Sequence, residues 1–163
     1  YSWATGAGER ALASRVSSLV EERFTAAAPD LRQDGEGQGE FFSPWGLQAL
    51  LLGQVLGPEA LASWLAVQSL EPQDIAVITD LRSAHHLAIH ASRAWGLWEA
   101  HRATGELAWR EAWDRHVAAS EALHPQWEGD RRAYAHWVPQ FTLYALALSM
   151  EDHPLALSEE DRP

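Results

Sequence analysis

The stretch from Asp80 to Gly105, DLRSAHHLAIHASRAWGLWEAHRATG, decides the fold of this chain. Its apolar residues recur at helical spacing, about 100° per residue, which predicts one long helix over residues 80–105. One broad face collects Ala84, Leu87, Ala91, Ala94, Trp95 and Trp98, and a roughly opposite face collects Ile89, Gly96 and Ala100. Because both faces need burial, we expect this helix to lie inside the protein.

A narrow stripe runs between these two faces and contains His86, His90, Arg93, Leu97 and His101. Buried polar side chains need hydrogen-bond partners, so the stripe predicts a polar cavity or a buried hydrogen-bond network. We expect His86, His90 and Arg93 to be buried with polar partners, and His136 to approach them.

The length and composition predict a single globular domain. A chain of 163 residues can bury a core, and 47% hydrophobic residues with nine tryptophans exclude a disordered acidic tail. There is no apolar run of about 18 residues, so no membrane-spanning helix is expected. The N-terminus carries no charged segment followed by an apolar one, but a removed signal or an upstream domain stays open because the chain begins at Tyr1.

Charge and residue usage narrow the partners. Without cysteine the chain has no disulfide or thiolate chemistry, and its redox compartment cannot be read. All twelve basic residues are arginines, and the lack of Lys and Asn indicates the codon bias of a GC-rich genome. A net charge of −11 argues against binding to nucleic acid or to an anionic membrane, and we interpret it as favouring solubility.

The organisation is predicted to be all-helical, as one domain over residues 1–163. An N-terminal helix and an acidic Gly-rich loop occupy 1–45, helical hairpins occupy 46–150, and a flexible tail occupies 151–163. The expected helices cover 8–28, 46–56, 58–69, 80–105, 106–123 and 138–150, and Ile75–Thr79 could form a short strand.

The segment WGLWEAHRATGELAWREAWDRH reads as two helices joined by a tight reversal at Thr104 and Gly105. It resembles the hairpins of (α/α) toroids, the barrels of paired helices found in many glycosidases and polysaccharide lyases. The chain has too few predicted helices to close such a barrel. The expected fold is therefore all-α, toroid-like or a half-toroid.

A second resemblance covers residues 80–148. It is carried by Ser92, Arg93, Ala94 and Trp95, then His116, then His136 and Trp137, followed by Phe141, Tyr144, Ala145 and Leu146. This pattern resembles one in bacterial proteins of unknown function that are helical toroids with a further N-terminal half. Where that pattern has an acidic residue or Asn near Ser-Arg-Ala-Trp, this chain has Ala88, Ile89 and His90. The resemblance implies a fold and a site location but no reaction. We expect a soluble bacterial protein, and the sequence leaves open whether it is cytoplasmic or secreted.

The candidate catalytic residues are His90, His136 and Asp80, since acid–base chemistry needs imidazoles and a carboxylate within reach of one substrate. Substrate contacts are expected from the polar side chains of the stripe and of the last helix, and from aromatic rings at loop–helix junctions that can stack on sugars or plug the barrel end. These residues are His86, Arg93, His101, Gln140, Trp45, Tyr134 and Trp137. Trp95, Trp98, Trp109 and Trp113, by contrast, are expected in the core.

Each of these assignments has an alternative. His86 and His90 lie one turn apart and could bind zinc, although Leu87 stands where a helical zinc protease has Glu. The two histidines could equally be structural, paired with backbone groups or acids. Arg93 could hold an anionic substrate group or form an ion pair between helices.

Three functions therefore stay open. The leading one is a carbohydrate-active or related small-molecule hydrolase or lyase with a His, Arg and aromatic pocket. The alternatives are a non-catalytic helical module that binds a ligand or assembles, and a metal-dependent enzyme that uses His86 and His90. Because residues 46–56 and 139–149 are apolar nearly all round, we also expect a homo-oligomer, or a missing N-terminal half, burying at least about 1,000 Å².

Overall fold

The computed structural model describes residues 2–26, 41–81 and 83–151 and is all-helical over them. Its main helices are α1 (Ser2–Gly6), α2 (Arg10–Phe24), α3 (Pro44–Leu56), α4 (Pro58–Gln68), α5 (His85–Thr104), α6 (Leu107–Trp127) and α7 (Val138–Glu151). Two short turns of helix lie between them, the 3-10 turn η2 (Pro72–Asp74) and the π-helix η3 (Arg131–Ala135). The predicted fold class is thus confirmed, while the toroid arrangement stays a prediction. Much of the acidic Gly-rich loop and nearly all of the tail lie outside the described residues.

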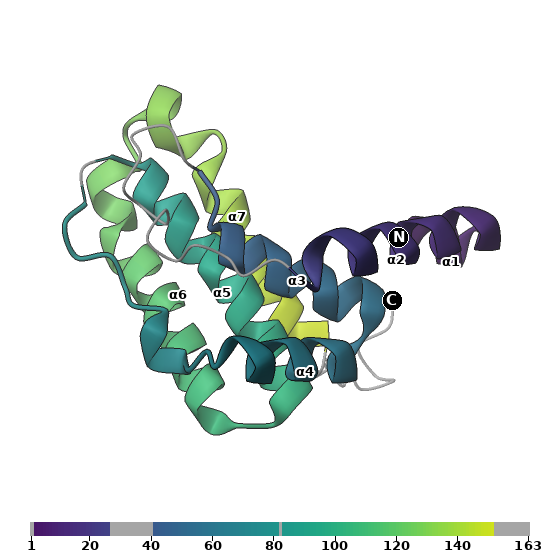
Figure 1. The fold of residues 1–163 in the computed structure, drawn as a ribbon. Helices are drawn as coiled ribbons and strands as arrows, with labels where there is room; N and C mark the ends of the chain where they lie inside the picture. Colours follow the sequence, from purple (N-terminus) through teal and green to yellow (C-terminus); the bar gives the residue numbers. More distant parts are fainter. Residues whose placement is uncertain (1, 27–40, 82, 152–163) are drawn as a thin grey trace, which may run out of the picture.

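Helix α5 is the central element, as the sequence predicts. Fifteen consecutive residues of it, from His86 to Ala100, are buried. Helices α3, α4, α6 and α7 all pack against it, and Figure 1 shows α5 between α6 and α3, with α1 and α2 extending to one side. A helix that is covered on every side needs no polar face, which explains why its sequence shows none beyond the histidine stripe.

Two glycines allow α3 and α5 to cross at close range. A Cβ on Gly46 would overlap the carbonyl oxygen of Ser92, and a Cβ on Gly96 would lie 2.8 Å from the Trp45 ring. The start of α3 is tied to α5 as well, because the Ser43 N–H donates to Ser92 Oγ over 2.8 Å. The Ser43 hydroxyl also accepts from the Gly46 N–H and so caps α3.

The tryptophans predicted for the core are buried. Trp95, Trp98, Trp109 and Trp113 are each no more than 5% exposed, and all four belong to the main hydrophobic cluster. The same cluster contains Trp45, which is fully buried and stacks on Trp109 with 6.3 Å between ring centroids. The expectation that Trp45 lies at a pocket mouth is therefore wrong: the close crossing at Gly46 and Gly96 draws its ring into the core.

Several predicted elements differ from the structure, most clearly the start of the long helix, the end of the following helix and the strand. The long helix begins at His85 rather than Asp80, and α6 continues through Pro125 to Trp127, although Pro125 has no N–H to donate to the carbonyl of Glu121 one turn earlier. Residues Ile75–Thr79 form no strand, because side chains of α5 take up backbone groups that a second strand would need. Within the described ranges, no helix has the length and apolar character required to cross a membrane.

Candidate functional site

The segment 75–80, which we call the strap, is fastened to α5 by two side chains of the histidine stripe. Nε2 of His90 accepts a hydrogen bond of 3.0 Å from the Ile78 N–H, and the Arg93 guanidinium donates to the Ala76 carbonyl. Since Nε2 acts as the acceptor, neutral His90 carries its proton on Nδ1. His86, His90 and Arg93 are 3%, 0% and 6% exposed, so their predicted burial is confirmed.

The imidazole facing His90 belongs to His116 of α6, not to His136. The two ring centroids lie 5.9 Å apart and the ring planes are nearly perpendicular, at 87°. His116 is fully buried, and its Nδ1 lies 2.9 Å from the Ala112 carbonyl, one turn earlier in the same helix. We call His90, His116 and Arg93 the buried imidazole cluster.

Burial keeps both imidazoles of this cluster uncharged. Loss of hydration lowers the pKa of His90 to about 3, helped by the nearby His116, Arg93 and His86. It also lowers the pKa of His116 to about 4, although the carbonyls of Ala112 and Ala76 act in the opposite direction. The strap is therefore held by one neutral hydrogen bond, to His90, and one charged hydrogen bond, from Arg93.

A metal at this cluster has limited support from the geometry. The His90 Nε2 lone pair already accepts the Ile78 N–H, and the guanidinium of Arg93 lies close by. In the ranges that the structure describes, no group of three or more His, Cys, Asp or Glu side chains could hold a metal ion. Zinc on His86 and His90 stays a prediction.

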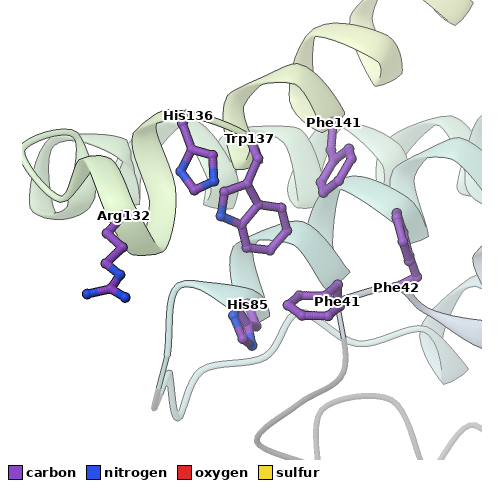
Figure 2. Close-up of a pocket in the computed structure, with 7 residues that line it drawn as sticks. All are labelled: Phe41, Phe42, His85, Arg132, His136, Trp137 and Phe141. Atoms are coloured by element: carbon purple, nitrogen blue, oxygen red, sulfur yellow. The ribbon is translucent and has the colours of Figure 1, made fainter.

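A second candidate site is an open pocket of about 420 Å³, shown in Figure 2, whose lining combines aromatic rings with a few polar side chains. We call it the aromatic pocket, and it is lined by Phe41, Phe42, His85, Arg132, His136, Trp137 and Phe141. The residues come from the segment just before α3, the start of α5, the π-helix η3, the two residues between η3 and α7, and the first turn of α7. Figure 2 shows Arg132 and His136 at one end, Phe42 and Phe141 at the other, and Trp137 between them.

The rings of the pocket pack edge to face. The Phe41 centroid lies 4.3 Å from that of His85 and 5.1 Å from that of Trp137, with interplanar angles of 60° and 84°. Trp137 also meets Phe141 at 5.5 Å and 76°. Such pairs are the geometry that aromatic quadrupoles favour, so the rings support one another while part of each stays exposed.

The polar end of the pocket is built on the π-helix η3. Helices of this type are rare in proteins, and those that occur often lie at functional sites. His136 Nδ1 bonds to the Arg131 carbonyl, which fixes Nδ1 as the protonated nitrogen and leaves Nε2 as the acceptor of neutral His136. The Arg132 N–H donates to Asp130 Oδ1 over 3.1 Å, and this bond holds the first turn of η3. Arg132 itself is exposed.

The structure separates the candidate catalytic residues. His90 is fully buried against the strap, whereas His136 is exposed and lines the aromatic pocket, to which His90 does not contribute. Asp80 is exposed at the end of the strap. The expectation that His136 approaches His90 is therefore wrong, because the π-helix carries His136 to the protein surface.

The candidate binding residues are also divided. Trp137 lines the aromatic pocket, while Gln140, one turn later, is exposed outside its lining. Tyr134 is buried and its hydroxyl bonds to His124 Nδ1 over 2.7 Å; burial, with Glu128 nearby, raises the pKa of the phenol. His101 is half-buried, and its Nδ1 lies 3.1 Å from the Glu106 carbonyl at the turn between α5 and α6.

Sequence reasoning missed His85, Arg132 and three phenylalanines of the pocket. His85 lies beside His86 in the chain but points about 100° away from it around the helix, so it falls outside the buried stripe. Arg132 follows α6 in a stretch that reads as a polar loop. The cluster HWVPQF at 136–141 was the available signal, since it puts an imidazole and two rings within about two helical turns.

The residues behind the second resemblance do come together in part. The Trp95 indole N–H donates to the Phe141 carbonyl over 2.9 Å, and the Trp95 ring contacts the rings of Phe141 and Tyr144. These contacts fasten α7 to α5 and so place the start of α7 beside the pocket. Comparisons with family models, curated proteins and solved structures found no match for this chain.

Proposed function

We propose that this protein is a helical module that binds a small organic molecule in the aromatic pocket. The observation that carries the proposal is the convergence of four aromatic rings, two imidazoles and a guanidinium on one open pocket of about 420 Å³. Pockets of about 300–1,000 Å³ with a mostly apolar lining and a few polar groups are typical ligand sites. In this proposal the buried imidazole cluster is structural and holds the strap.

A ring-shaped ligand fits this lining best. Trp137 and Phe41 offer partly exposed ring surfaces, on which the face of a sugar or an aromatic ring can stack. His85 and His136 stand on either side of Trp137, with centroids 5.5 Å and 6.3 Å from its ring, and could orient polar substituents. A saccharide, as expected from the toroid resemblance, is one such ligand.

The test is a binding screen against mono- and oligosaccharides and against small aromatic compounds, read by saturation-transfer NMR. We expect at least one compound to bind, and Trp137→Leu to weaken its binding by tenfold or more. Trp127→Leu is the matched control, because Trp127 is also half-buried and packs in the same small cluster as Trp137 but does not line the pocket. Equal binding by native protein and the folded Trp137→Leu variant would exclude the pocket as the site.

A hydrolase or lyase is the second candidate, favoured by the two imidazoles on one pocket. Imidazoles are the commonest general acid and base groups, and His85 and His136 could give and take a proton across a bound ring. The test is turnover of the saccharides that bind. We expect His136→Gln to abolish turnover while weakening binding far less, and a bound compound that is never converted would leave the binding module as the function.

A further inference from the structure

We propose that the ligand of the aromatic pocket carries an acidic group, a carboxylate or a phosphate, held by Arg132 and His136, with its apolar body on Trp137, Phe41 and Phe141. This inference rests on the proposed function, because it names the chemistry of the molecule that the pocket binds. It starts from the polarity of the pocket, which differs between its two ends.

The polar end offers hydrogen-bond donors and cationic charge. Among the residues that the structure describes, the lining contains one guanidinium and two imidazoles but no carboxylate. No ion pair joins the Arg132 guanidinium to an acid in the same described part of the chain, and the nearby Asp130 carboxylate accepts from the Arg132 backbone N–H instead. A planar guanidinium of this kind matches the two oxygens of a carboxylate or phosphate.

His136 can bond to an acidic group in either protonation state. Its Nδ1–H is committed to the Arg131 carbonyl, so Nε2 is the nitrogen that remains for a ligand. Neutral His136 can accept from a protonated acid group, and charged His136 can donate to an anion. The side chain therefore accommodates an acid whether the proton lies on the ligand or on the imidazole.

The apolar end fixes the other half of the ligand. Phe42 and Phe141 lie on the far side of Trp137 from Arg132, as Figure 2 shows, and their centroids are 5.1 Å apart. This end of the lining supplies no polar side chain. A neutral sugar, with hydroxyl groups around its whole ring, would find no hydrogen-bond partner among the lining side chains there, whereas a flat apolar body needs none.

The overall charge of the chain opposes an anion, but it acts from a distance. At −11 the protein as a whole repels acids, yet charges beyond about 8 Å are largely screened at physiological salt. Contacts with Arg132 and His136 act at about 3–4 Å and are screened much less. The local contacts, and not the net charge, should therefore determine the affinity for an acid. The preference for an acid over an uncharged ligand should shrink as the salt concentration is raised.

The experiment compares three probes with the same ring body, 2-naphthoate, 2-naphthyl phosphate and the uncharged 2-naphthamide, by titration calorimetry. We expect at least one acid to bind native protein about fivefold more tightly than the amide, as an exposed charge pair allows. Arg132→Gln should remove this preference, so that the acids bind no more tightly than the amide. Arg131→Gln is the matched control, since it makes the same charge change at the adjacent exposed residue outside the lining, and it should keep the preference.

The outcomes separate the two proposals. The acid that shows the preference identifies the head group as carboxylate or phosphate. If all three probes bind equally and Trp137→Leu weakens all of them, the acidic head is wrong while the pocket remains the site. If the preference survives Arg132→Gln, or Arg131→Gln removes it equally, the assigned position of the acid is wrong. If no probe binds native protein, the inference is overturned, and the wider screen alone decides the proposed function.

Discussion

At the scale of single residues, the buried imidazole cluster links pH to stability. His90 and His116 are neutral in the folded protein, with pKa values lowered to about 3 and about 4, whereas both regain an ordinary pKa of about 6.5 when the chain unfolds. Below about pH 6.5 the unfolded state therefore binds more protons than the folded state. The free energy of unfolding is therefore not reduced by these two histidines above about pH 6.5. It falls as the pH drops from there towards their pKa values in the folded protein.

The size of this effect gives the first prediction. As the pH falls from about 7.5 to about 4.5, each histidine should lower the free energy of unfolding by about 2 to 3 kcal/mol. We expect His116→Gln, which cannot titrate, to lose less stability over this interval than the native protein by about that amount. Urea unfolding at both pH values measures it. Parallel losses in the native and variant proteins would mean that His116 is charged in the folded state.

The residue scale also shows where sequence reasoning succeeded and where it stopped. The burial of His86, His90 and Arg93 was predictable, because their helix is apolar on two opposite faces. Their partners were not, since the Ile78 N–H and the Ala76 carbonyl belong to a strap whose course depends on tertiary packing. The pairing of His90 with His116 rather than His136 depends in the same way on how α6 lies against α5.

At the scale of the elements, the crossing of α3 over α5 depends on the absence of two side chains. Gly46 and Gly96 face each other there, and a Cβ on Gly96 would lie 2.9 Å from the Cα of Gly46. The backbones approach too closely for any larger residue. The sequence showed Gly96 inside a helical pattern, where an isolated glycine is often a packing position, and Gly46 at the start of another, but it could not show that they meet.

The second prediction follows from this crossing. Gly46→Ala should lower the unfolding free energy by about 3 kcal/mol, because the added methyl group overlaps the Ser92 backbone and the helices must move apart. Gly129→Ala is the control: a Cβ there meets nothing within 4 Å, so stability should change by less than about 0.5 kcal/mol. Chemical denaturation of the two variants measures both values. If Gly46→Ala and Gly129→Ala had similar unfolding free energies, the two helices would have to cross elsewhere.

The connections between elements were easier to predict than the start of the long helix. Gly57 with Pro58 and Gly105 mark real helix boundaries, since both glycines have positive φ angles of 95° and 72°. Asp80 to Ala84 continue the apolar pattern of α5, but the strap holds Ala76 and Ile78 against α5 itself, so the chain must turn before the helix can begin. A local pattern carries no information about that turn.

At the scale of the whole molecule, the question is which apolar surface stays uncovered. Helix α3 finds partners within the chain in α2, α4 and α5, and its Leu47 stays 39% exposed. Helix α7 packs mainly on α5, with weaker contacts to α6. Leu143, Tyr144 and Met150 on α7 are 65%, 41% and 49% exposed, and a surface of this kind favours an interface.

The third prediction concerns assembly through α7. We propose that the protein forms a homo-oligomer, so light scattering at micromolar concentration should report a mass above the 18.1 kDa of one chain. Leu143→Glu should lower that mass towards the monomer by placing a charge in the interface. Val67→Glu is the control, because Val67 is 78% exposed on α4, away from α7. A monomer mass for the native protein would contradict the proposal.

The central claim, that the aromatic pocket binds a small ring-bearing molecule, is tested most directly by the indole N–H signals of the ¹⁵N-labelled protein. The nine tryptophans provide nine such probes, and Trp137→Phe identifies the one that lines the pocket. During titration with 2-naphthoate, or with a compound found in the screen, we expect the Trp137 signal to shift progressively while those of the buried Trp45 and Trp109 stay in place. A Trp137 signal that does not move when the ligand is shown to be bound would contradict the account.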